Sequence, residues 1–146
     1  MNNETIEYCT ENPLKTEELG FLVASEINKP SVIALFGNLG SGKTAFTRGF
    51  VKALNPEAEV HSPTFTIVND YSGNGYNIYH FDMYRIADFD DLYSTGYFDY
   101  LNDNKYLIIE WSENIAEYLP DNCIKIYISR CDNENVRLFK VYGYNQ

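Results

Sequence analysis

The sequence predicts an α/β fold in which helices flank a mixed, mostly parallel central sheet. Two short runs, 31–36 and 106–109, are almost entirely apolar, as expected of strands buried on both faces of a parallel sheet. Segments with apolar residues at helical spacing alternate with such runs, which is typical of an α/β chain. No repeat, low-complexity tract or linker divides the 146 residues, so we expect one domain over 1–146.

The first half of the chain is predicted to form a strand at 5–9 and two helices around the first apolar run. The first helix opens at Asn12-Pro13 and ends at Ile27. Its apolar positions are Leu14, Leu19, Leu22, Val23 and Ile27. The second helix covers 43–54. Its apolar positions, four residues apart on one face, are Phe46, Phe50 and Leu54.

The second half of the chain is predicted to begin with a β-hairpin, because 64–71 and 76–81 flank the turn-forming residues 72–75. The remaining predicted elements are a short helix at 88–93, a buried strand at 106–110, a helix at 112–119 capped by Ser112, and two strands at 124–129 and 136–142. Together these strands complete the mixed sheet.

The composition restricts the possible functions. The formal net charge is −10, from 11 basic and 21 acidic residues. Nucleic-acid affinity comes largely from Lys and Arg that release counterions from phosphates, so the chain is a poor candidate for holding RNA or DNA by itself. Three cysteines without metal-ligand spacing indicate free thiols in a reducing compartment. With no signal peptide and no apolar run long enough for a membrane span, we expect a cytoplasmic protein.

A glycine-rich segment carries the strongest functional signal. Residues Gly37 to Thr44 match G-x-x-x-x-G-K-[ST] in full, between a predicted buried strand and a predicted helix. The glycines let backbone N–H groups face a phosphate, and the helix N-terminus points at the same anion. Lys43 is expected to bridge the β- and γ-phosphates and Thr44 to bind Mg²⁺. The residues predicted to hold ATP are Gly37, Asn38, Leu39, Gly40, Ser41, Gly42, Lys43, Thr44 and Ala45.

Two carboxylates are candidates to complete this site. Glu110 ends the buried strand 106–110, and Asp82 ends the second strand of the hairpin. A P-loop site needs an acid for its metal and a group that positions the attacking water. The sequence leaves open which of the two activates the water. Because no Asn/Thr-Lys-x-Asp guanine motif occurs, ATP is preferred over GTP.

Four motifs in order give the chain a family resemblance. With the glycine-rich segment, Ser62-Pro-Thr-Phe65, His80-x-Asp-x-Tyr-Arg85 and Glu110-Trp111, it resembles the TsaE family, the bacterial ATPases of tRNA threonylcarbamoyladenosine biosynthesis. The resemblance extends over about residues 16–120 and implies a small P-loop NTPase fold.

The resemblance also implies roles for single residues. Thr44 and Glu110 would hold Mg²⁺, Lys43 would neutralise charge, and Asp82 would position or activate water. Thr64 would lie in a mobile, switch-like loop near the γ-phosphate. Those implied to shape the site or face a partner are His80, Arg85 and Trp111. Taken alone, His80 and Trp111 also fit structural roles, and Arg85 also fits an ion pair with the acids at 88–91.

The implied partners are TsaD and TsaB, with tRNA reached only indirectly through their complex. ATP hydrolysis would reset that complex between turnovers. The chain offers no clear arginine finger, since Arg48 is expected to face away from the glycine-rich loop and Arg85 is a weak candidate. We therefore predict slow hydrolysis by the chain alone and a partner that completes the site.

Two other functions fit a P-loop. A small-molecule or nucleoside kinase would need an arginine-rich lid and an acceptor pocket, for which 146 residues with 11 basic side chains leave little room. A nucleotide-dependent interaction switch would need binding and a shape change but no hydrolysis, and 62–65 could serve as its moving part. Substitution of Asp82 or Glu110 separates this switch from an ATPase.

Overall fold

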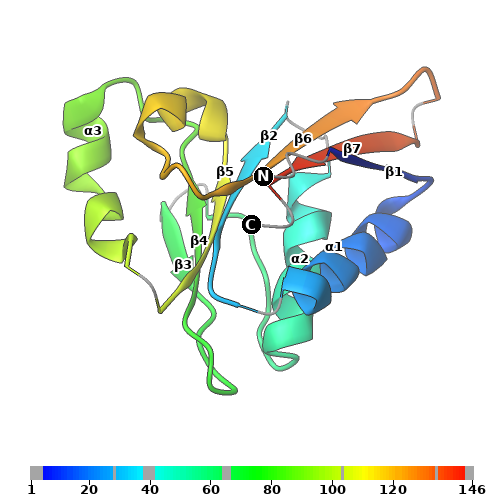
Figure 1. Ribbon diagram of the computed structural model, residues 1–146, viewed down its shortest axis with the longest axis horizontal. Helices are drawn as coiled ribbons and strands as arrows, with labels where there is room; N and C mark the ends of the chain where they lie inside the picture. The colour runs from blue at the N-terminus through cyan, green and yellow to red at the C-terminus, as the bar shows by residue number, and fades with distance from the viewer. Residues whose placement is uncertain are drawn as a thin grey trace.

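The elements of the fold follow the predicted alternation of strands and helices (Figure 1). The computed structural model describes residues 5–27, 29–37, 42–63, 67–102, 104–133 and 135–143. In order, these residues form β1 (Ile6–Thr10), α1 (Pro13–Ile27), β2 (Val32–Phe36), α2 (Lys43–Leu54), β3 (Val68–Asp70), β4 (Ile78–Asp82), α3 (Phe89–Ser94), η1 (Tyr97–Tyr100), β5 (Tyr106–Glu110), η2 (Ser112–Tyr118), β6 (Ile124–Arg130) and β7 (Arg137–Tyr142).

The seven described strands form one mixed sheet in the order β1-β7-β6-β2-β5-β4-β3. The four central strands, β6, β2, β5 and β4, are parallel, while β1, β7 and β3 pair in antiparallel fashion at the two edges. The predicted α/β class with a mixed, mostly parallel sheet is therefore confirmed. Since parallel strands end at the same edge of a sheet, the carboxyl ends of β2, β5 and β4 are brought together.

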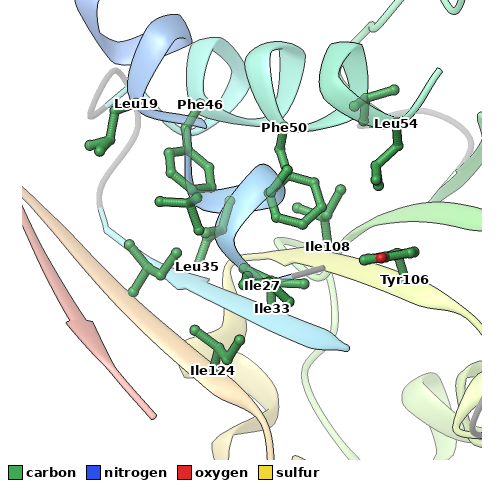
Figure 2. Packing of buried hydrophobic residues seen from close by; sticks show 14 of the residues in the cluster. Leu19, Ile27, Ile33, Leu35, Phe46, Phe50, Leu54, Tyr106, Ile108 and Ile124 are labelled. Carbon is green, nitrogen blue, oxygen red and sulfur yellow. The ribbon is translucent and has the colours of Figure 1, made fainter. Parts of the chain in front are cut away.

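Helices α1 and α2 cover one side of the sheet, and α3 lies on the other (Figure 1). Figure 2 shows Phe46, Phe50 and Leu54 projecting from α2 toward Ile33 and Leu35 of β2. All three α2 side chains are buried, as the four-residue spacing predicts. Burial of each of the two phenylalanines contributes about 2–3 kcal/mol of hydrophobic stabilisation.

The apolar face predicted for α1 is only partly right. Leu14 and Leu22 are exposed, whereas the small residues Gly20 and Ala24 are buried. The cause is the close approach of α1 and α2. A β-carbon at Gly20 would lie 2.0 Å from the carbonyl oxygen of Phe46, so the contact face of α1 centres on its small residues rather than on its leucines.

A second apolar cluster lies on the opposite face of β4 and β5. Ile108 of β5 belongs to the cluster under α1 and α2, whereas its neighbour Ile109 points to the other side. The side chains packed with Ile109 come from β4, α3, η1 and η2 and include Phe81, Leu92, Tyr97 and Ile115. The strand β5 is thus buried on both faces, as its apolar run predicts.

The hairpin is confirmed, and the helix predicted at 112–119 is corrected. Strands β3 and β4 pair antiparallel around a tight turn in which Asn74 and Gly75 both have positive φ. Residues 64–66 of the predicted first strand lie outside the described residues. The segment after β5 is the 3-10 helix η2, and Ser112 does not cap it, because its hydroxyl donates to the carbonyl of Ile109 at 2.8 Å.

Along the described residues, none of the helices has both the length and the apolar character that a membrane crossing requires. Cys9, Cys123 and Cys131 are free thiols, as predicted from their spacing.

Candidate nucleotide site

The site lies where β2, β4 and β5 end at one edge of the sheet. Ala34 of β2 is in register with Ile109 of β5, and Glu110 of β5 is in register with Asp82 of β4. Gly37 follows β2 at the same edge of the sheet, beyond the residues paired with β5. The sheet register, rather than sequence proximity, brings Asp82 and Glu110 together.

The junction of β2 and α2 positions Lys43. Residues 38–41, predicted to hold ATP, lie outside the described residues. Gly42 precedes α2 with a left-handed φ of 103°, and Lys43 begins the helix. The Lys43 side chain is buried, and its Nζ donates a hydrogen bond of 2.6 Å to the carbonyl oxygen of Gly37. Thr44 and Ala45 are partly exposed in the first turn of α2.

The electrostatic surroundings of Lys43 combine burial with negative charge. Burial lowers the pKa of the Lys43 ammonium from its ordinary value, and the carboxylates of Glu110, Glu113 and Asp82 oppose that shift. The ammonium also lies 3.9 Å from the centre of the Trp111 ring, close enough for a cation–π contact. Lys43 is therefore a buried cation next to the Trp111 ring and under the influence of three acidic charges.

Glu110 and His80 form a buried pair. Both side chains are almost inaccessible, with 4% and 0% exposure respectively. Nε2 of His80 hydrogen-bonds Oε2 of Glu110. An ionised carboxylate only accepts hydrogen bonds, so Nε2 is the donor when Glu110 is charged. Because His80 has no exposed surface, the prediction that it could face a partner is wrong, and its position is inside the site.

Asp82 is held by the backbone on either side of it. Its Oδ1 accepts a hydrogen bond from the N–H of Tyr84 at 2.9 Å, and its own N–H donates to the carbonyl of Ile67 at 2.9 Å. The side chain is 8% exposed. These contacts fix Asp82 at the end of β4, beside Glu110.

Of the remaining predicted residues, Trp111 and Arg85 are described, and both have exposed surface. Trp111 is partly exposed and packs on Tyr84, with ring centres 4.9 Å apart. Trp111 has a left-handed φ of 58°, which directs the chain away from the strand β5. Arg85 is exposed. Thr64 lies outside the described residues.

The donors present fit Mg²⁺. A hydroxyl at Thr44 and a carboxylate at Glu110 are the oxygen ligands that this ion uses beside a nucleotide, with water and phosphate oxygens completing the shell. The hydrogen bond from His80 occupies Oε2 of Glu110 and orients the carboxylate, as outer partners of metal ligands do. Among the residues described, no group of three or more acidic, His or Cys side chains could hold a metal by itself.

Two residues of this region were missed by the sequence analysis. Glu113 accepts a hydrogen bond of 3.1 Å from the N–H of Gly37, although 76 positions separate them. Tyr71 contacts His80, with ring centres 5.9 Å apart. No local sequence pattern identifies either residue. In the sequence, Glu113 resembles any exposed acid, and Tyr71 is one aromatic residue among many residues of predicted strands.

The sheet order and the strand-to-helix junction at Lys43 define a small P-loop NTPase fold. The model of the family "Threonylcarbamoyl adenosine biosynthesis protein TsaE" matches residues 10–138. The chain belongs to this family.

Similar proteins support this assignment. The TsaE protein of Haemophilus influenzae is 39% identical over 80% of this chain and 75% of its own length. The TsaE protein of Bacillus subtilis is 34% identical over 94% of this chain and 87% of its own. The crystal structure of Bacillus subtilis YdiB superposes with a TM-score of 0.78 at 31% identity, covering 95% of this chain and 85% of that one. The family's role is in tRNA threonylcarbamoyladenosine biosynthesis.

Proposed function

We propose that the protein is a Mg²⁺-dependent ATPase that resets a TsaB–TsaD-like complex between rounds of tRNA modification. The observation that carries this proposal is Lys43, a buried ammonium held 2.6 Å from the Gly37 carbonyl and influenced by the charges of Glu110, Glu113 and Asp82. A buried cation at the start of a helix that follows a glycine-rich loop is suited to a triphosphate. The family's role in tRNA modification supports the biological setting.

Each residue has a separate task in this proposal. Lys43 binds the β- and γ-phosphates and neutralises charge that develops on transfer. Thr44 and Glu110 hold Mg²⁺, which supplies further charge neutralisation when it is bound. Asp82, beside Glu110 at the edge of the sheet, orients the attacking water. This task is given to Asp82 because Glu110 is assigned to the metal; each of the two carboxylates already accepts a hydrogen bond, Glu110 from His80 and Asp82 from the Tyr84 N–H.

The chain is proposed to need help for fast hydrolysis. Arg48 lies on α2 with its guanidinium 3.9 Å from Glu17 of α1, so it is engaged on the helical side of the sheet. Arginine residues that stabilise the transition state of P-loop enzymes can be supplied by a partner protein. With a net charge of −10, the chain suits contact with basic protein surfaces better than with tRNA. The three free thiols are consistent with a cytoplasmic setting.

The test is ATP turnover by the purified chain, alone and with TsaB and TsaD added. We expect slow release of phosphate by the chain alone and a large increase with both partners. Fast turnover that partners do not change would contradict the need for them. Transfer of the γ-phosphate to an acceptor without phosphate release would indicate a kinase, and nucleotide-dependent partner binding without any turnover would indicate a switch.

A further inference from the structure

The segment 61–67, which contains the Ser62–Phe65 motif, is tied at both described ends to the strands of the site. At its start, the N–H of His61 donates to the Tyr71 hydroxyl at 3.0 Å, and that hydroxyl donates to the His61 carbonyl at 2.8 Å. At its end, the carbonyl of Ile67 accepts from the N–H of Asp82 at 2.9 Å. Both attachments lead to residues next to the candidate nucleotide site.

Tyr71 connects the start of this segment to Glu110. Its hydroxyl lies 3.4 Å from Nδ1 of His80, whose Nε2 hydrogen-bonds Glu110. Tyr71 and His80 are both buried, so water does not compete strongly for these contacts. A chain of close polar contacts therefore runs from the backbone of His61 through two buried side chains to Glu110.

The hydroxyl of Tyr71 has one hydrogen and two acceptors within reach. When Nε2 of a neutral His80 donates to Glu110, Nδ1 is an acceptor and faces the hydroxyl. The hydroxyl instead donates to the His61 carbonyl, which is the shorter contact. A displacement of His61 would release this hydrogen to His80. The hydroxyl oxygen of Tyr71 thus links the position of His61 to the hydrogen bonding of the Glu110–His80 pair.

We propose that Tyr71 is a positioning residue that couples the backbone of His61 to the orientation of the Glu110 carboxylate. Tyr71 does not contact the nucleotide in this proposal; it acts through His80. The proposal rests on the function proposed above, because it assigns Glu110 a role in ATP hydrolysis. It gives His61 a physical route to the site that does not depend on contact with phosphate.

The substitution Tyr71→Phe tests this coupling while keeping the aromatic ring in the core. We expect single-turnover hydrolysis, measured with the protein in excess over ATP, to fall by roughly tenfold or more, because small misplacements of catalytic groups are costly. Nucleotide affinity should stay within about twofold, since Lys43 and the loop amides are unchanged. An unchanged rate would overturn the proposal.

Tyr97→Phe is the matched control. Tyr97 is also buried, and its hydroxyl donates to a backbone carbonyl, that of Tyr118, at 3.0 Å. It lies in the cluster on the other face of β4 and β5. Tyr71→Phe removes more hydrogen bonds than Tyr97→Phe, so Tm is measured for both variants and their turnover is compared well below the lower Tm. Equal losses of turnover in the two variants would show a general effect of stability and would overturn the coupling.

Amide hydrogen exchange gives a readout that does not need hydrolysis. We expect a non-hydrolysable ATP analogue with Mg²⁺ to slow exchange at the His61 amide in the original protein and to lose most of this effect in Tyr71→Phe. The same response in both proteins, or no response in the original one, would overturn the coupling. If the original protein binds the analogue but never hydrolyses ATP, the proposed ATPase function fails, while the exchange result still decides the role of Tyr71.

Discussion

The two sides of the candidate site are built in different ways. The phosphate side, consisting of Gly37 and residues 42–45, depends on backbone placement and on one buried lysine. The carboxylate side, consisting of His80, Asp82 and Glu110, depends on buried side chains that bond one another and the backbone. Affinity and catalysis should therefore respond to different substitutions. In the proposed function, backbone groups and Lys43 bind the phosphates, whereas carboxylate side chains act on the water and the metal.

The phosphate side also depends on packing far from the phosphates. Its helix, α2, lies against α1 at two glycines, and a β-carbon at Gly49 would come within 1.7 Å of the carbonyl oxygen of Glu17. No side-chain rotation relieves a contact with backbone. The carboxylate side is instead placed by the register of β4 and β5.

The largest effect is therefore expected for Gly49→Ala, which should damage the phosphate side through the fold. Overpacking at a closed contact costs roughly 1–3 kcal/mol, only partly offset by the better helix propensity of Ala. We expect Tm to fall by about 5–10 °C and nucleotide affinity to weaken with it. Thermal unfolding measures this, with Lys52→Ala on the exposed side of α2 as the control. A variant as stable as the control would show that α1 and α2 can separate without cost.

The next largest effect is expected from substitutions that separate catalysis, on the carboxylate side, from nucleotide affinity, on the phosphate side. Asp82→Asn and Glu110→Gln preserve shape and remove charge, so we expect turnover to fall by roughly 100-fold or more while Mg²⁺-ATP affinity stays within about fivefold. Glu117→Gln, an exposed acid on η2, is the control. Parallel loss of affinity and turnover would show that the carboxylate side is part of the binding site. Undiminished turnover in both variants would remove these acids from the chemistry.

The smallest effect is expected for Glu113→Gln, at the boundary between the two sides. Glu113 is an exposed carboxylate that accepts from the Gly37 N–H, and its charge opposes that of a triphosphate. Exposed charges interact weakly through water, so we expect ATP to bind only about two- to threefold more tightly, with little change in turnover. Weaker binding would instead show that Glu113 helps to hold the loop in a binding conformation.

Much of the fold could be predicted because its strongest signals are local. The apolar run before Gly37 and the four-residue spacing in α2 gave bounds that agree with the structure at Lys43 and Leu54. The orientation of α1 could not be predicted in this way. The buried surface of α1 includes Thr16, Gly20 and Ala24, which contribute little to a hydrophobic pattern. These residues are buried because the backbone of α1 packs closely against that of α2.

In the candidate site, too, local patterns identify some residues and miss others. Lys43 belongs to a local motif, and the acid at the end of an apolar strand indicated Glu110. The Tyr71–His80 and Gly37–Glu113 contacts could not be predicted, because they depend on which strands become neighbours and in which register. Sequence patterns locate residues along one strand or helix, whereas a hydrogen-bonded chain across several strands is a property of the assembled sheet.

The most direct test of the central claim is a calorimetric titration of Lys43→Ala with Mg²⁺-ATP. Loss of a buried cation that contacts phosphate should weaken binding by roughly 100-fold, since charge-assisted hydrogen bonds contribute most of the affinity for an anion. Lys52→Ala, which removes an exposed cation from the same helix, should bind as the original protein does. Equal affinity of Lys43→Ala and the original protein would contradict the account and would place the nucleotide elsewhere.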